Sequence, residues 1–460
     1  MSKQSADDQR IDRRIDHQPS ISPEAYFEEL RGLVDKARAS QTLPVERLPL
    51  LEARGRVLAE DIRSLVDIPG FANSAMDGYA VRSADLGSLP VTLRLVGVQP
   101  AGPRQDLSVG AGEAVAIMTG APLPAGADAV IQSELTEERD GEVVISAEAG
   151  QSGPRTFSDG SALAGMNIRA AGEDCRRGDL VLSAGTALGP RQLSAAASSG
   201  YAELPVVRPL RVAIISTGDE LAPTGTELLP GQIYESNSVL LAALAEAAGA
   251  QVVSVSSVDD EGQEMAAALD TLTGAALGGS ADVPADTTAD VILMSGGVSV
   301  GRFDVARNVL GAAPDARFVR VAIQPGKPQG HALWHGVPVI AFPGNPVGAF
   351  VSFTMFGAPF LHALAGGTFA LPKTVAVRAG DSWKCPKGRR QFVPVRILEP
   401  SDLDEGVADL SPLTTVIPLL EKGSRSHLVT RLALAEALAV VPAEVDRVEV
   451  GDEIQMMEIQ

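Results

Sequence analysis

The sequence is poor in cysteine and in basic residues. Cys175 and Cys385 are its two cysteines, and they stand far apart and outside any CxxC spacing. This argues against a disulfide framework or a structural zinc site and makes a reducing cytoplasm the natural setting. Lys and Arg number 38 against 58 Asp and Glu, a net charge of −20. That balance argues against a general nucleic-acid or anionic-membrane surface. It is compatible with a local basic pocket that binds a small anion.

Long hydrophobic signals of a targeted or membrane protein are also missing. Residues 1–21 are polar and lack the apolar core of a secretory signal, so we predict a disordered tail there. The most apolar run, 348–367, contains Pro359, His362 and several glycines, and it follows a proline-rich turn. These features favour a buried helix over a membrane span.

The chain is long and apolar, and the secondary structure that its sequence predicts changes from one region to the next. Its 460 residues are 45% hydrophobic, which predicts several globular domains. Ser22, Pro23 and Glu24 form a helix start for 22–40, and a second helix is predicted over 50–62. From about 70 to 168, short strand-like runs alternate with Gly/Pro turns, which predicts a small, mostly β insertion.

The second half changes from alternating elements to strands alone. Strand and helix patterns alternate from about 206 to 372, which indicates a doubly wound α/β domain. Strand-like runs from 373 onward predict a small terminal β domain.

Three loops leave predicted strands of the α/β domain at one edge, where ligands gather in such sheets. They are STGDEL at 216–221, SGGVSVGRFD at 295–304, and QPGKPQG at 324–330, which is followed by FPGNPVG at 342–348. Hydroxyls and backbone N–H groups at turns can hold oxyanions, and neighbouring carboxylates can hold a hard cation.

Each loop has an ordinary interpretation when taken alone. A glycine-rich segment after a strand is commonly a tight turn, and acidic residues are common at a helix start. Three such loops with carboxylates beside one sheet edge favour a phosphate-plus-magnesium site over coincidence. The segments match neither GxGxxG nor GxxxxGK[ST], so those nucleotide-binding hypotheses lose support.

The β insertion and its flanks contain further polar turns. Asp77 lies in FANSAMDGYAV, Thr119 and Gly120 follow a predicted strand, and 165–179 adds several charges, Asp174 among them. In isolation these residues are more often turns and solvated charges than ligands.

Together the segments resemble one family. NSAMDGYAV, IMTGAPLPAGADAVI, GEDCRRGD, STGDEL, SGGVSVGRFD, PGKP and PGNP occur in the order typical of the molybdopterin molybdenumtransferases, the MoeA and gephyrin E-domain family. The resemblance runs from about residue 22 to the C-terminus. It implies four domains: a linker/dimerisation domain (22–66 and 168–205), the β-rich insertion (67–167), a molybdopterin-binding α/β domain (206–372) and a C-terminal β-barrel (373–460).

The resemblance also implies a homodimer in which Asp77 and Thr119 cross to the partner's α/β domain. The implied reaction uses adenylylated molybdopterin, molybdate and Mg²⁺ and yields molybdenum cofactor and AMP, mainly by positioning and electrostatics. The implied setting is the cytoplasm, and a molybdopterin adenylyltransferase and apo-molybdoenzymes are possible partners.

The residues implied for the site fall into three groups. The candidate catalytic residues are Asp77, Thr119, Glu220, Asp304 and Lys327. The candidate substrate-binding residues are Ser216, Thr217, Gly218, Ser295, Gly296, Gly297, Ser299, Gly301, Arg320, Pro325, Gly326, Pro343, Gly344, Asn345, Pro346, Arg389 and Ser426. The candidate metal ligands are Glu220, Asp304, Asp174 and Asp259, with Asp260 as the alternative to Asp259.

Some positions depart from the family pattern and would change its anion contacts. Weaker molybdate affinity and compensation by neighbouring arginines are both open. The departures are Gln324 before PGKP, with Arg320 upstream; Gly348 after PGNPV; Pro394 in the terminal domain, with Arg396 nearby; and Glu436-Ala437 near the last strands.

Two other functions compete with molybdenum insertion. A related adenylyltransferase shares the GGxSxG and PGxP elements, but that family is a single α/β domain. A gephyrin-like scaffold is the second alternative, but no segment resembles a receptor-binding linker.

Overall fold

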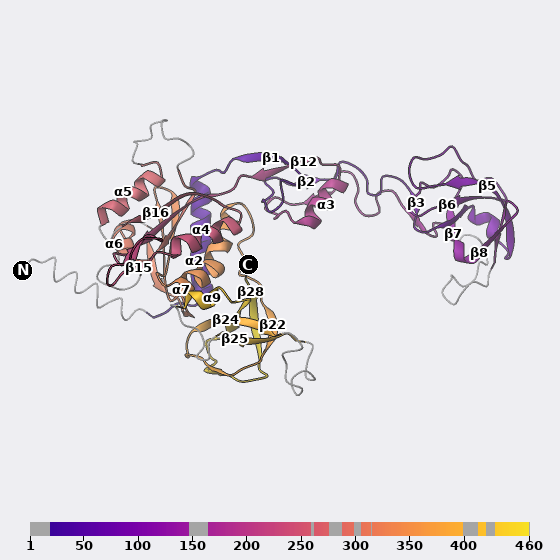
Figure 1. The fold of residues 1–460 in the computed structure, drawn as a ribbon. Coiled ribbons are helices and arrows are strands. Elements are labelled where there is room, and N and C mark those ends of the chain that lie inside the picture. The colour runs from indigo at the N-terminus through magenta and orange to yellow at the C-terminus, as the bar shows by residue number, and fades with distance from the viewer. Residues whose placement is uncertain are drawn as a thin grey trace, which may run out of the picture.

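The computed structural model describes residues 19–146, 164–258, 262–275, 288–298, 305–313, 315–398, 413–419 and 428–459. The chain is elongated (Figure 1): an α/β body and a terminal barrel lie at one end, a narrow segment lies in the middle, and a β insertion lies at the other end. Most of the predicted disordered tail falls outside the described residues. Ile21, which the prediction included in that tail, donates its backbone N–H to the Arg320 carbonyl at 2.8 Å.

The first described helix, α2 (Pro23–Ser40), begins as the sequence predicts. The Ser22 hydroxyl accepts the Ala25 N–H, and Pro23 occupies the first turn. Its apolar face, which includes Tyr26 and Leu30, shares one core with the sheet of the α/β body. The expected grouping of 22–66 as a linker therefore does not hold for this helix.

The helix predicted over 50–62 is wrong, because this stretch forms turns and short bridges. The Ala53 N–H bonds to the Pro49 carbonyl, and Gly55 adopts a left-handed φ of 79°. Val57 and Leu58 then pair with Ala187 and Val206. Backbone N–H and C=O groups that would have bonded within a helix are thus paired with distant strands instead.

The middle segment carries two short strand pairs and one helix around a small apolar core. These are β1 (Val45–Pro49) with β12 (Glu203–Val207), β2 (Ile62–Arg63) with β11 (Leu180–Leu182), and α3 (Pro190–Ser198).

The β insertion is a six-stranded sheet with the order β7-β4-β6-β5-β9-β8. Its strands are β4 (Gly78–Val81), β5 (Val91–Gln99), β6 (Glu113–Ile117), β7 (Ala129–Gln132), β8 (Thr136–Arg139) and β9 (Glu142–Ile145). Beside it, β3 (Asn73–Ser74) pairs with β10 (Ile168–Arg169). The predicted β-rich insertion is present.

The α/β body is built on a six-stranded sheet with the order β16-β13-β17-β21-β20-β18. The first four strands are parallel, β20 runs antiparallel to β21, and β18 runs antiparallel to β20. The strands are β13 (Arg211–Thr217), β16 (Gln251–Val258), β17 (Val291–Ser295), β18 (Arg317–Arg320), β20 (Pro328–Trp334) and β21 (Val337–Phe342). The helices are α4 (Asn237–Ala247), α5 (Gly262–Leu272), α6 (Val305–Leu310), α7 (Pro346–Ser352), a π-helical turn η5 (Phe353–Gly357) and α8 (Ala358–Leu364).

Both faces of this sheet are covered, which confirms the doubly wound prediction. Val212, Ile214 and Leu293 share a core with α2, α4, α7 and α8. The alternate residues Ala213 and Ile215 pack with α5 and α6. This alternation follows from the two-residue period of a strand.

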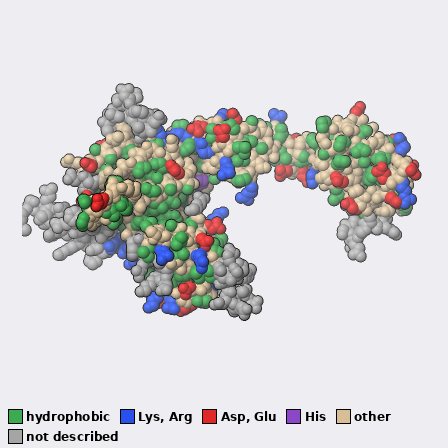
Figure 2. All heavy atoms as spheres, viewed as in Figure 1, with side chains coloured by type: hydrophobic (Ala, Val, Ile, Leu, Met, Phe, Trp, Pro, Cys, Tyr) green, Lys and Arg blue, Asp and Glu red, His purple; other side chains and the backbone are tan. Residues whose placement is uncertain are grey.

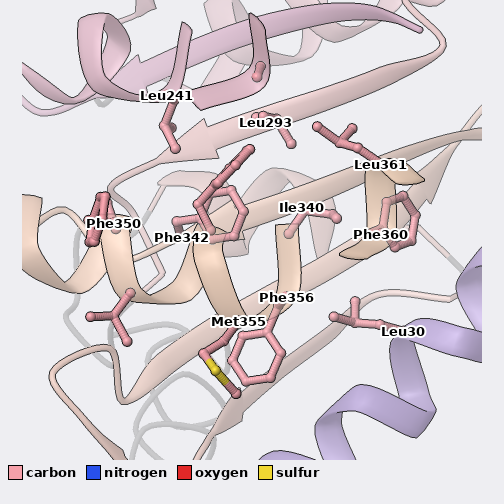
Figure 3. Close-up of a cluster of buried hydrophobic side chains, with 14 of the residues drawn as sticks. Leu30, Leu241, Leu293, Ile340, Phe342, Phe350, Met355, Phe356, Phe360 and Leu361 are labelled. Carbon is pink, nitrogen blue, oxygen red and sulfur yellow. The ribbon is translucent and has the colours of Figure 1, made fainter. Parts of the chain in front are cut away.

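The long apolar run is a core helix, as predicted. Among the described residues, one helix (346–364) is long and apolar enough to span a membrane, but 78% of its apolar window is buried inside the protein. Phe350, Met355, Phe356 and Phe360 point into the core that α2 also enters through Leu30 (Figure 3).

The C-terminal region closes into a five-stranded barrel, which confirms that expectation. Its strands are β22 (Val375–Ala379), β24 (Arg390–Leu398), β25 (Thr415–Pro418), β26 (Ala437–Val441) and β28 (Glu453–Glu458), and β24 pairs with both β25 and β26 to close the ring. A short strand of the α/β body, β19 (Ile323–Gln324), adds to the start of β24. The barrel and the body are thus joined by main-chain hydrogen bonds.

Candidate functional site

The carboxyl ends of β13, β17 and β21 meet at one edge of the sheet. Ser216 pairs with Ser295, and Ser295 pairs with Phe342. The Gly296 N–H donates to the Phe342 carbonyl at 3.2 Å. The structure therefore brings together the predicted substrate-binding residues of 216–218, 295–297 and 343–346.

Glycine is required where these loops cross. Gly296 has a φ of 94°, and a Cβ there would lie 2.5 Å from the Thr217 carbonyl oxygen. Gly297 has a φ of 62°, and a Cβ there would lie 3.0 Å from the Ala306 nitrogen. Side chains at either position would push the loops apart.

Asn237 connects two of the loops, and sequence reasoning missed it. Its Nδ2 donates to Ser295 Oγ at 2.7 Å and to the Gly344 carbonyl at 2.6 Å. Asn237 is the first residue of α4, and two residues separate it from β15 (Ile233–Tyr234). The polar triplet 236–238 ahead of an apolar helix was the available signal.

Three buried polar atoms at this edge have no hydrogen-bond partner among the described residues. They are Ser216 Oγ, Thr217 Oγ1 and Asn237 Oδ1. Ser216 is 1% exposed, Thr217 5% and Asn237 8%. Because unpaired buried polar atoms are costly, their concentration here indicates a place where a polar ligand completes the hydrogen bonding.

Glu220 stands at the rim of the same edge. Its backbone carbonyl accepts the Ile233 N–H at 2.9 Å, which holds β14 (Leu221–Ala222) beside β15. A Cβ on Gly218, whose φ is 149°, would lie 2.7 Å from the Glu220 carboxylate, so this carboxylate folds back over the loop. Glu220 itself is exposed to solvent.

Whether this edge can hold Mg²⁺ depends on the carboxylates that lie near it. The described part of the chain holds no group of three or more His, Cys, Asp or Glu side chains suited to a metal. Mg²⁺ commonly takes one or two carboxylates together with substrate phosphates and water, so Glu220 fits as one ligand. Asp174 lies between β10 and β11, where its N–H donates to the Ile68 carbonyl at 2.9 Å, whereas Glu220 lies between β13 and β14 of the α/β body.

Several predicted site residues fall outside the described residues. They are Asp259, Asp260, Ser299, Gly301, Asp304 and Ser426.

The buried side-chain amide of Gln329 holds the loop that contains Lys327 in place. Gln329 Nε2 donates to the Gly326 carbonyl at 2.6 Å and to Ser352 Oγ at 2.5 Å. The Lys327 carbonyl accepts the Val321 N–H at 2.8 Å, which ties this loop to the end of β18 near Arg320. The peptide before Pro325 is cis.

The departures from the family pattern lie around this loop and in the barrel. Arg389 Nη1 donates to Gln324 Oε1 at 3.3 Å, so a barrel arginine contacts the position before PGKP. A Cβ on Gly348 would lie 3.4 Å from the Gly326 nitrogen. Pro394 is buried within β24, whereas Arg396 is exposed.

The remaining departure, Glu436, has a local structural role. Its carboxylate accepts the Ile397 N–H at 2.7 Å, beside the start of β26. Ala437, the first residue of that strand, is fully buried.

Asp77 and Thr119 contact each other in the β insertion, far from the strand-end loops of the same chain (Figure 1). The Thr119 N–H and hydroxyl both donate to Asp77 Oδ1, at 2.7 and 2.8 Å. These two bonds, the backbone one first, hold the pKa of the Asp77 carboxyl below its usual value. Phe71, Met76 and Met118 are exposed apolar residues close in sequence to this pair.

These features define a multidomain α/β protein with unpaired buried hydroxyl and amide groups at one sheet edge, a long arm that carries a β insertion, and a terminal barrel. Three family models match consecutive parts of the chain. They are described as the MoeA N-terminal region (domains I and II), residues 25–200; a probable molybdopterin binding domain, residues 213–363; and the MoeA C-terminal region (domain IV), residues 376–459.

Several proteins are similar to this chain over most of its length. Molybdopterin molybdenumtransferase 2 of Mycobacterium tuberculosis is 37% identical over 444 residues, which is 94% of this chain and 98% of that protein. Molybdopterin molybdenumtransferase of Haemophilus influenzae is 37% identical over 72% of this chain and 78% of its own length. A crystal structure of the molybdopterin biosynthesis MoeA protein of Pyrococcus horikoshii has a TM-score of 0.70 at 25% identity, covering 96% and 100% of the two chains.

The chain belongs to the MoeA family of molybdopterin molybdenumtransferases. The resemblance inferred from the motifs is confirmed. The matches to the N-terminal and C-terminal regions cover parts that a single-domain adenylyltransferase lacks.

Proposed function

We propose that this chain is a molybdenum insertase that acts on adenylylated molybdopterin and molybdate with Mg²⁺ and releases molybdenum cofactor and AMP. The observation that carries the proposal is the sheet edge at which Ser216, Thr217 and Asn237 present unpaired buried polar atoms beside glycine-rich loops. Such an edge suits a polar, phosphate-bearing ligand. Membership of the family supplies the reaction class.

The described residues have distinct roles under this proposal. The loop at 295–297 approaches the phosphoanhydride with its backbone, because glycines leave that backbone uncovered. Lys327, on its braced loop, attracts the molybdate dianion, which is a substrate. Glu220 holds Mg²⁺, which when bound offsets the charge of the phosphates. Anhydride cleavage then depends on positioning and charge stabilisation rather than on a dedicated acid–base pair.

The first experiment follows AMP release from purified protein given adenylylated molybdopterin, Mg²⁺ and molybdate. We expect molybdate-dependent release, and about a 100-fold lower rate for Glu220→Gln. Glu227→Gln, the same change on an exposed residue of the following loop, is the matched control and should retain activity. Well-folded wild-type protein that releases no AMP in response to molybdate would overturn the proposal.

We also propose a homodimer in which Asp77 and Thr119 complete the partner's site. The support is that the arm holds this pair far from the strand-end loops of its own chain (Figure 1). In addition, Leu229, Ile233 and Tyr234 are exposed beside the site, and Figure 2 shows apolar side chains gathered over this part of the body. A second copy would cover such a surface.

Mixed dimers test the shared site. Asp77→Ala and Glu220→Ala homodimers should each be inactive, whereas a mixture of the two should regain part of the activity, because every mixed dimer contains one intact site. If mass spectrometry shows mixed dimers and activity stays absent, the residues do not act across the interface.

The proposed setting is the cytoplasm, with substrate arriving from a molybdopterin adenylyltransferase and product passing to apo-molybdoenzymes. The support is the reaction class and the two free thiols, Cys175 and Cys385. Activation of an added apo-molybdoenzyme by the reaction mixture tests the transfer, and failure with free cofactor as a positive control would argue against it.

A further inference from the structure

Asn237 occupies a position where α4 meets two strand-end loops. Its Nδ2 donates to Ser295 Oγ, at the end of β17, and to the Gly344 carbonyl, after β21. The two bonds measure 2.7 and 2.6 Å, and both are buried or partly buried. One amide group therefore connects the loop after β17 with the loop after β21. Ser295, at the end of β17, and Pro343, directly after β21, are 48 positions apart in the sequence.

The chemistry of the contacts fixes the orientation of this amide. The Gly344 carbonyl can only accept a hydrogen bond, so the nitrogen of the side chain must face it. The oxygen, Oδ1, then points elsewhere and has no partner among the described residues, although Asn237 is 8% exposed. A purely structural amide would leave no buried acceptor unsatisfied.

A second unpaired atom lies on the same face of the sheet. Ser216 and Ser295 are register partners on adjacent strands, so their side chains project to one side. That side is the one covered by α4, because Ile214 and Leu293 share a core with Leu241. Ser216 Oγ also lacks a partner within the described chain. Two independent buried groups thus remain to be satisfied at this edge.

We propose that Asn237 is a positioning residue, which locks the loops after β17 and β21 at the separation that the bound substrate needs and turns Oδ1 toward a donor on that substrate. The inference rests on the proposed function for its ligand. The lock itself is a property of the free protein and can be measured without substrate.

Hydrogen–deuterium exchange of the free protein tests the lock. Asn237→Ala should raise amide exchange at least tenfold in peptides that cover 293–298 and 341–346, while β16 stays protected. Asn237→Asp has the same shape but cannot donate, so it should give the same result. Leu241→Ala is the control. It weakens the packing of the buried face of the same helix but leaves both hydrogen bonds of the Asn237 side chain in place.

Kinetics separates positioning from stability. Both Asn237 variants should lose about 10- to 100-fold in kcat/KM for AMP release, since small displacements of positioning groups have effects of this size. Leu241→Ala should keep kcat/KM within about threefold at a temperature where it is folded. Unchanged loop exchange in Asn237→Asp, or equal kinetic losses in Leu241→Ala, would overturn the inference. If the wild type releases no AMP, the proposed function fails. The exchange experiment still shows whether Asn237 holds the two loops together.

Discussion

Replacing His331 with leucine should make the α/β body less sensitive to mild acid. His331 lies in the middle of β20, is 4% exposed, and has no partner for Nδ1 among the described residues. Its ring lies 5.7 Å from that of Tyr26, in an apolar core. Burial lowers the pKa of His331 from 6.5 to about 4, because the charged imidazolium is poorly solvated there.

The surrounding charges do not offset this burial. Glu29 and Asp315 raise the pKa of His331, whereas Arg317 and Lys36 lower it. These four residues form two ion pairs with each other, Arg317 with Glu29 and Lys36 with Asp315. Opposite charges therefore largely cancel at the imidazole, and burial decides the direction.

The size of the effect follows from the two pKa values. Above pH 6.5 the ring is neutral in both states, and its contribution to stability is fully present. As the pH falls toward 4, the unfolded chain takes up a proton that the folded His331 refuses, so stability is lost. Linkage gives a loss of about 2 kcal/mol between pH 7.5 and pH 5, since one pKa unit corresponds to about 1.4 kcal/mol.

Urea unfolding at pH 7.5 and pH 5 measures this loss. Trp334 lies in β20 and Trp383 in the barrel, so a Trp383→Phe background makes tryptophan fluorescence report on the α/β body alone. Other groups titrate equally with and without the His331→Leu change, and the difference between the two proteins isolates His331. An equal acid-induced loss in both proteins would refute the burial argument.

Three further changes probe other parts of the chain. Gly296→Ala should lower the free energy of unfolding by about 2–4 kcal/mol in urea melts, because its Cβ meets a backbone oxygen at 2.5 Å and its φ is 94°; an unchanged midpoint would show that the loop relaxes freely. Asp290→Ala should cost about 3 kcal/mol in the same assay, since it strands the part-buried Arg208 that it binds at 2.7 and 2.9 Å, and a loss under 1 kcal/mol would contradict this. Thr119→Val should raise the pKa of Asp77 in a carbon-13 NMR titration, as one of two donors is lost while the backbone N–H remains; no change would mean that the hydroxyl contributes nothing.

The sequence predicted elements best where local chemistry and burial agreed. The cap at Ser22 with Pro23 after it predicted the start of α2, and the alternating strand and helix patterns of 206–372 predicted the α/β sheet. The prediction failed at 50–62, where helix-forming residues surround Gly55. There the bridges of Val57 and Leu58 to distant strands prevailed over local propensity.

For the candidate site, the strand-end loops were visible in the sequence because glycines, hydroxyls and carboxylates follow apolar runs. Asn237 was marked only by the polar triplet 236–238, and an asparagine at a helix start has an ordinary capping interpretation. Its actual partners, Ser295 and Gly344, are brought to it only when three strands align.

By itself, the sequence determined the family, the order of the domains and the residue types available at the sheet edge, since these depend on motifs and short-range periodicity. Tertiary structure alone decided that α2 joins the α/β body, that the Asp77–Thr119 pair sits at the end of an arm, and that Asn237 Oδ1 is left unpaired. Each of these depends on which distant segments pack together, and packing is a property of the whole chain rather than of any local pattern.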